Sequence, residues 1–137
     1  MIHFFNITVM RKGRLIILLI IAILATVSCD DEIFGPRSLE GTWRVTETSE
    51  VFDMQSFMIG IGYFPGDSSR ILIDNFSNLG MGYEVVADVS GLSLVIPQQT
   101  VRDFRISGSG TTTVNLRRIN WTYRIDGDKY TAVFEKQ

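Results

Sequence analysis

The stretch that decides the fold lies near the C-terminus and reads INWTYRIDGDKYTAVF, residues 119–134. Large apolar residues occupy every second position from Ile119 to Ile125, with polar residues between them. This alternation is typical of a β-strand that buries one face. The Asp-Gly-Asp sequence at 126–128 supplies turn residues, and the alternation then resumes as far as Phe134. The segment is therefore predicted to be an antiparallel hairpin.

The same alternation recurs throughout residues 38–137, and no window there keeps a helical period for three turns. About eight short strands joined by tight turns leave no room for crossover helices. Eight antiparallel strands can close into an up-and-down barrel, which also removes exposed sheet edges. We therefore predict an all-β barrel domain over residues 38–137, with a two-sheet sandwich as the alternative.

Two strand boundaries are predicted from turn-forming residues. Pro97 is expected to end the strand that carries Leu92, Leu94 and Ile96, because proline cannot donate a ladder hydrogen bond. The Gly-Ser-Gly sequence at 108–110 is expected to end the next strand, which carries Phe104 and Ile106.

The N-terminal segment has the pattern of a targeting signal. From Met10 the chain carries a basic stretch, an apolar run from Leu15 to Ala25 and then small residues before Cys29. These are the parts of a cleaved secretion signal, and the run is shorter than the ~20 residues that cross a bilayer. Residues 1–28 are therefore predicted to be a signal peptide, with Met10 as the suspected true start.

The end of this signal resembles a lipobox, in which a cysteine receives a diacylglyceryl group. Ser28 and Cys29 fit that motif, whereas Thr26 stands where it usually has leucine. The resemblance implies lipid attachment at Cys29, and the alternative is a secretory signal followed by a free thiol. The acidic cluster that follows is similar to signals that export lipoproteins to the outer face of the outer membrane, and the alternative is a solvated linker. It consists of Asp30, Asp31 and Glu32, within a tether of residues 29–37.

The mature part is acidic and lacks the residues of the common catalytic sites. Three of the 13 basic residues, Arg11, Lys12 and Arg14, precede residue 29, whereas all 15 acidic residues follow them. The resulting excess of acid argues against nucleic-acid binding. His3 and Cys29 are the only residues of their kinds. Histidine- or cysteine-dependent catalysis, Cys/His metal sites and internal disulfides are thus excluded from the predicted barrel. We therefore expect that the protein is not an enzyme and that it binds neither a cofactor nor a metal.

The Gly-Thr-Trp sequence at 41–43 resembles the Gly-x-Trp signature of lipocalins, in which the tryptophan closes one barrel end and a late arginine stacks over it. The resemblance implies a lipocalin-like barrel similar to small lipoproteins of Gram-negative surfaces, with Gly41 and Trp43 at a closed end. Alternation places Arg117 on the inward face of its strand, where it is expected to cap Trp43. The alternative is a bulge that turns Arg117 and Arg118 to solvent. The two tryptophans and Tyr123 are expected in the core, and the alternative is that they contact a ligand.

The most apolar stretch of the mature chain covers residues 57–64. One interpretation is an apolar lip that meets a lipid or a partner, and the other is a strand buried on both faces. The residues of this candidate lip are Phe57, Ile59, Ile61, Tyr63 and Phe64.

Three carboxylates lie close together in the sequence, at Glu47, Glu50 and Asp53. Their spacing is that of neither a glycosidase pair nor an EF-hand loop. We therefore expect all three to be solvated.

These features together predict a lipid-anchored protein of the outer membrane, exposed on the cell surface if the acidic cluster is an export signal. Its domain is predicted to be a non-enzymatic binding module for a small apolar ligand or an envelope partner. The alternative is a structural or protein-interaction lipoprotein whose core is filled and has no ligand pocket. The barrel interior separates the two, because ligand pockets usually enclose ~300 Å³ or more.

Overall fold

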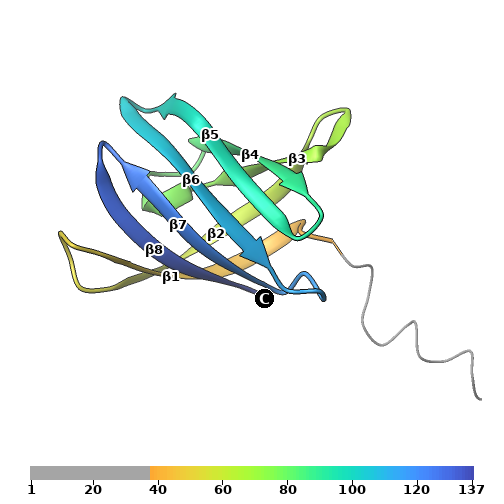
Figure 1. Ribbon diagram of the computed structural model, residues 1–137, viewed down its shortest axis with the longest axis horizontal. Helices are drawn as coiled ribbons and strands as arrows, with labels where there is room; N and C mark the ends of the chain where they lie inside the picture. Colours follow the sequence, from red (N-terminus) through yellow and green to blue (C-terminus); the bar gives the residue numbers. More distant parts are fainter. Residues whose placement is uncertain (1–37) are drawn as a thin grey trace, which may run out of the picture. The chain divides into compact units, whose positions relative to one another are not determined.

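The computed structural model describes residues 38–137, and these form a closed barrel of eight antiparallel strands in sequential order (Figure 1). The prediction of an all-β, up-and-down barrel is confirmed, and the sandwich alternative is wrong. The strands are β1 (Gly41–Ser49), β2 (Gln55–Phe64), β3 (Asp67–Asp74), β4 (Glu84–Ser90), β5 (Ser93–Val101), β6 (Phe104–Thr112), β7 (Arg118–Ile125) and β8 (Asp128–Lys136).

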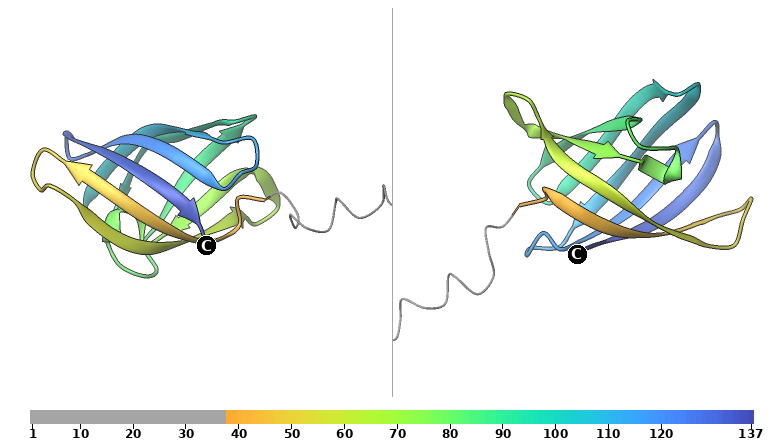
Figure 2. Two further views of the ribbon diagram at one scale, coloured as in Figure 1. Left: turned by 90° about the horizontal axis from the view of Figure 1, so that it is seen from below. Right: turned by 180° about the vertical axis from the view of Figure 1, so that it is seen from behind.

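Closure of the barrel depends on β1, which pairs with β2 on one side and with β8 on the other. Trp43 lies opposite Ile59 of β2 and opposite Lys136 of β8. Figure 2 shows β8 running beside β1, with the C-terminus next to the start of β1. Every strand therefore has two hydrogen-bonded neighbours, so the barrel presents no free sheet edge.

The barrel has two different ends, which we call the entry end and the far end. At the entry end the described chain begins at Ser38, and this end also carries the β2–β3, β4–β5 and β6–β7 connections. The far end carries the β1–β2, β5–β6 and β7–β8 connections and a short 3-10 turn, η1 (Phe76–Asn78), between β3 and β4. No helix in residues 38–137 is long and apolar enough to span a bilayer.

The core follows the predicted alternation most clearly in β7. Ile119, Trp121, Tyr123 and Ile125 are buried, and the residues between them are exposed. The same inward positions on the other strands form one continuous hydrophobic cluster with them. The predicted core positions of Trp121 and Tyr123 are confirmed.

The glycines at 108 and 110 do not end a strand, so this predicted boundary is wrong. The strand β6 continues through them to Thr112. A Cβ at Gly108 would lie 2.4 Å from Cβ of Tyr123, and one at Gly110 would lie 2.6 Å from Cε3 of Trp121. Both glycines therefore make room for the large rings of β7.

Pro97 does not end its strand either, and β5 runs past it to Val101. The register with β6 shifts between Ile96 and Gln99, so the proline lies in a β-bulge, where a ladder donor is not required. The side chain of Gln99 then replaces backbone pairing with β4. The Val86 N–H donates to Gln99 Oε1 at 2.9 Å, and Gln99 Nε2 donates to the Val86 carbonyl at 2.8 Å.

Candidate functional site

Buried hydrophobic side chains pack together inside the barrel. Each of the eight strands contributes at least one buried hydrophobic residue. Rings from different elements meet across the interior: the centroids of Phe76 and Tyr123 lie 4.6 Å apart, and those of Trp121 and Phe134 lie 5.7 Å apart. Rings from η1, β7 and β8 therefore contribute to one packed core.

Trp43 closes the entry end of the barrel. The indole is fully buried, and its Nε1 donates to the carbonyl of Leu39 at 2.9 Å. The Lys136 ammonium lies 5.9 Å from the centre of the indole ring and also donates to the Ser38 carbonyl. Gly41 has a φ of 142°, and a Cβ there would lie 3.1 Å from Cε of Lys136. The position thus requires glycine because of both its backbone conformation and the approach of Lys136.

The expectation that Arg117 caps Trp43 is wrong, because Lys136 of β8 is the cation over that ring. Arg117 is exposed, and it precedes β7, which begins at Arg118. The alternation fails there because Leu116 adopts a positive φ of 57°, which breaks the extended path before the strand. Arg118 is also exposed, and its Nη1 lies 3.8 Å from a Glu135 oxygen. Both arginines therefore face solvent, as the alternative interpretation predicted.

The stretch at 57–64 is a strand with one buried face, so the interpretation of a strand buried on both faces is wrong, and the candidate lip is wrong for Ile59 and Ile61. Ile59 and Ile61 point into the core, and Phe57 and Tyr63 pack against it. Outward positions carry glycines and Met58, which is 42% exposed. Phe64, the last member of the candidate lip, is half-buried, with the Arg70 guanidinium 5.7 Å from its ring centre.

The expectation of a solvated carboxylate is wrong for Glu47, which is fully buried, whereas Glu50 and Asp53 are exposed. The cause is the alternation of β1, because Glu47 is the third inward position after Trp43 and Val45. A buried charge is costly unless hydrogen-bond donors replace the lost water.

Three donors from three different elements surround the Glu47 carboxylate. Gln55 Nε2 of β2 donates to Oε1 at 2.7 Å, and Ser77 Oγ of η1 donates to the same oxygen at 3.0 Å. The Tyr123 hydroxyl of β7 donates to Oε2. Glu47 forms no ion pair with any residue of 38–137. We call these four residues the far-end cluster, and it joins β1, β2, β7 and η1 under the far end.

The turn η1 covers this cluster and closes the far end. Phe76 is fully buried, and Asn75, Ser77 and Asn78 have positive φ values of 58°, 51° and 60°. The Asn75 side chain holds the turn in place. Its Nδ2 donates to the Met58 carbonyl at 2.9 Å, and its Oδ1 accepts a hydrogen bond from the backbone N–H of Gly80, which lies after η1. Both barrel ends are therefore closed by an aromatic side chain.

Burial, with a smaller contribution from the Glu47 carboxylate, raises the pKa of Tyr123 far above its usual range. A raised pKa means that the folded protein keeps this proton at a pH where the unfolded chain releases it. The stabilisation is complete below pH 10 and is lost as the pH rises above it.

We expect the free energy of unfolding to fall more steeply between pH 9 and pH 11 in the wild type than in Tyr123→Phe, by up to about 1.4 kcal/mol per pH unit above pH 10. Denaturant unfolding at several pH values measures this difference. Tyr83→Phe, which changes a half-exposed ring, is the control and should keep the wild-type slope. Parallel curves for all three proteins would contradict the role of Tyr123.

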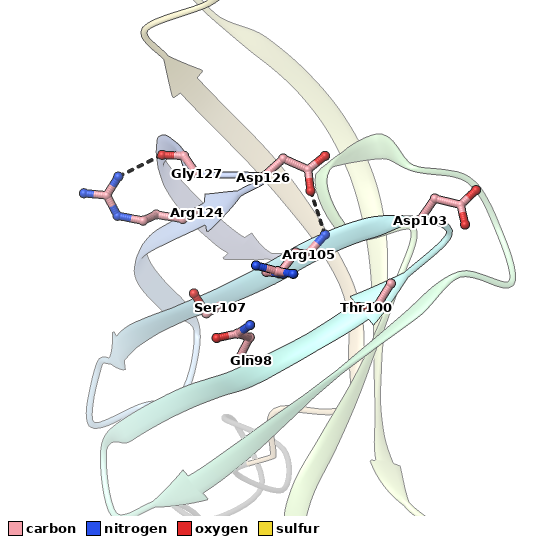
Figure 3. A pocket seen from close by; sticks show the side chains of 8 residues that line it. All are labelled: Gln98, Thr100, Asp103, Arg105, Ser107, Arg124, Asp126 and Gly127. Carbon is pink, nitrogen blue, oxygen red and sulfur yellow. Dashed lines mark hydrogen bonds between the residues drawn. The ribbon is translucent and has the colours of Figure 1, made fainter.

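A polar groove lies on the outer face of β5, β6 and β7, near the far end (Figure 3). It has a volume of about 630 Å³. Arg105 projects into it beside Gln98 and Ser107, while Arg124 points away and donates through Nη1 to the Gly127 carbonyl at 2.9 Å. Sequence analysis missed this groove, because its residues are the ordinary polar members of three alternating strands. The lining residues are Gln98, Thr100, Asp103, Arg105, Ser107, Arg124, Asp126 and Gly127.

The remaining predictions fall outside the described residues. They are the signal peptide of residues 1–28, the tether of residues 29–37, lipid attachment at Cys29 and the export signal at Asp30, Asp31 and Glu32. All of these stay predictions. Within residues 38–137 no group of three or more His, Cys, Asp or Glu side chains is placed to hold a metal ion.

Comparison with known proteins adds no family to this description. No protein-family model matches the sequence, and a search of curated proteins found no significant match.

Proposed function

We propose that this protein is a lipid-anchored lipoprotein of the outer membrane whose barrel is an interaction module that binds its partner on the outer surface. The observation that carries this proposal is the continuous cluster of buried hydrophobic residues inside the barrel, with a buried ring near each end, Trp43 and Phe76. Such a core favours the alternative of an interaction lipoprotein over a carrier of a small apolar ligand. The lipid anchor itself rests on the sequence at Cys29.

A fluorescent fatty acid tests the filled interior. The barrel unit, residues 37–137, contains its own closed core, so we expect it to fold without the preceding segment. Titration with cis-parinaric acid should give no saturable fluorescence change with this unit. A fatty-acid carrier protein titrated under the same conditions is the positive control for the probe. Stoichiometric binding by the wild type would overturn the proposal in favour of an apolar-ligand carrier.

A labelled fatty acid tests the anchor. Cells that express the full chain and grow with the label should incorporate it into the wild type and not into Cys29→Ser, because the diacylglyceryl group attaches to the cysteine sulfur. Gel fluorography of the purified proteins measures incorporation. Equal labelling of the two proteins would exclude lipidation at this residue.

A further inference from the structure

The polar groove contains a guanidinium that no acidic side chain neutralises. Arg105 forms no ion pair with any residue of 38–137. The nearby Asp126 is bound to the backbone instead, since its Oδ1 accepts the Arg105 N–H at 2.9 Å. Figure 3 shows the Arg105 guanidinium directed toward Gln98 and Ser107, which carry further hydrogen-bonding groups. Arg124 of the same lining also forms no ion pair within residues 38–137, but it is bound to the Gly127 carbonyl, so Arg105 is the cation that the groove offers to a ligand.

The groove also contains acceptors that limit which anions fit it. Asp103 and Asp126 lie along its lining, and Asp126 keeps one oxygen free for a second donor. Two carboxylates repel a ligand that carries many negative charges, such as an acidic peptide. The same carboxylates accept hydrogen bonds from hydroxyl groups. A ligand with one carboxylate and several hydroxyls matches this arrangement best.

We propose that the polar groove binds an acidic sugar, with the sugar carboxylate on Arg105 and its hydroxyls on Gln98, Ser107 and Asp126. A guanidinium suits this role, because its planar set of donors matches a carboxylate in two parallel hydrogen bonds. The volume of about 630 Å³ is within the range of small-ligand sites. This inference rests on the proposed function, because it names the partner class of the outer surface.

The position of the groove fits a partner other than the protein's own membrane. Two turns that contribute to it, β5–β6 and β7–β8, belong to the far end. The described chain begins at Ser38, at the entry end. Any anchor that precedes Ser38 thus joins the barrel at the end opposite these turns.

The test uses the full chain in detergent micelles, titrated with glucuronate, which carries one carboxylate and several hydroxyls, and followed by calorimetry. We expect saturable binding, and we expect Arg105→Gln to weaken it by about tenfold or more, because a charge-assisted pair is lost. Arg117→Gln is the matched control, since it removes the same charge from an exposed arginine at the entry end and should bind like the wild type. Neutral glucose should bind the wild type at least about tenfold more weakly than glucuronate.

Three results would overturn the inference. They are no binding of glucuronate, equal affinity in Arg105→Gln and the wild type, and equally tight binding of hexaglutamate, which would favour an acidic peptide. Because Arg105 is exposed, its replacement should leave the thermal midpoint unchanged, so a loss of binding reports on the groove. None of these results tests the proposed function itself. If the proposed function is wrong, the barrel unit will bind the fatty acid, and that is a separate measurement.

Discussion

Trp43→Ala is expected to leave the barrel barely folded. The indole is fully buried at the entry end, and its Nε1 bonds to the Leu39 carbonyl. Truncation removes the ring, leaves a cavity and orphans that carbonyl, at a cost of about 3–5 kcal/mol. A domain of this size has only about 5–15 kcal/mol of stability. Denaturant unfolding followed by circular dichroism measures the loss, and a mild effect would contradict the closing role of Trp43.

Lys136 and Arg117 provide a matched pair of cations at the same end. Lys136→Ala should cost about 1 kcal/mol, because the ammonium lies over the indole and donates to the Ser38 carbonyl. Arg117→Ala should cost about 0.5 kcal/mol or less, as an exposed change does. Equal losses would mean that the contact of Lys136 with Trp43 contributes nothing.

Gly108→Ala is expected to destabilise the barrel by about 3 kcal/mol, although it adds a single methyl group. That methyl carbon would lie 2.4 Å from Cβ of Tyr123 and 2.7 Å from the Thr122 carbonyl oxygen. Neither atom belongs to the far end of a flexible side chain, so β6 and β7 themselves would have to separate. The shift of the thermal midpoint measures the effect.

Gly60→Ala is the control for this prediction. Gly60 also lies within a strand, β2, but a Cβ there would meet no atom within 4 Å. The replacement should be neutral or slightly stabilising, because alanine loses less backbone entropy than glycine on folding. If both glycine variants lose the same stability, crowding against Tyr123 is not the reason that position 108 needs glycine.

Local alternation predicted the barrel, because every strand buries one face and exposes the other. It failed where a distant part of the chain decides the outcome. Gly108 and Gly110 have the pattern of a turn in isolation, and only the rings of Tyr123 and Trp121 explain why the strand continues through them. Pro97 is similar, since its bulge is compensated by the side chain of Gln99.

The candidate sites depended even more on distant contacts. Alternation placed Glu47 on the same face as Trp43, yet a carboxylate can be buried there only because donors arrive from elsewhere. One of them, Tyr123, is 76 positions away in the sequence. No local pattern encodes that meeting. The polar groove was equally hidden, because three strands contribute to it and none of them carries a motif.

The pairing of β1 with β8 also constrains the order of events in folding. Thr48 and Thr131 bond to each other through their hydroxyls, although 83 positions separate them. During synthesis β1 therefore waits for β8 before it gains its second neighbour, and a contact of such long range makes folding slow. Until then one side of β1 stays unpaired, and the sheet has not closed into a barrel. The seam between β1 and β8 is thus the last part of the barrel that can form.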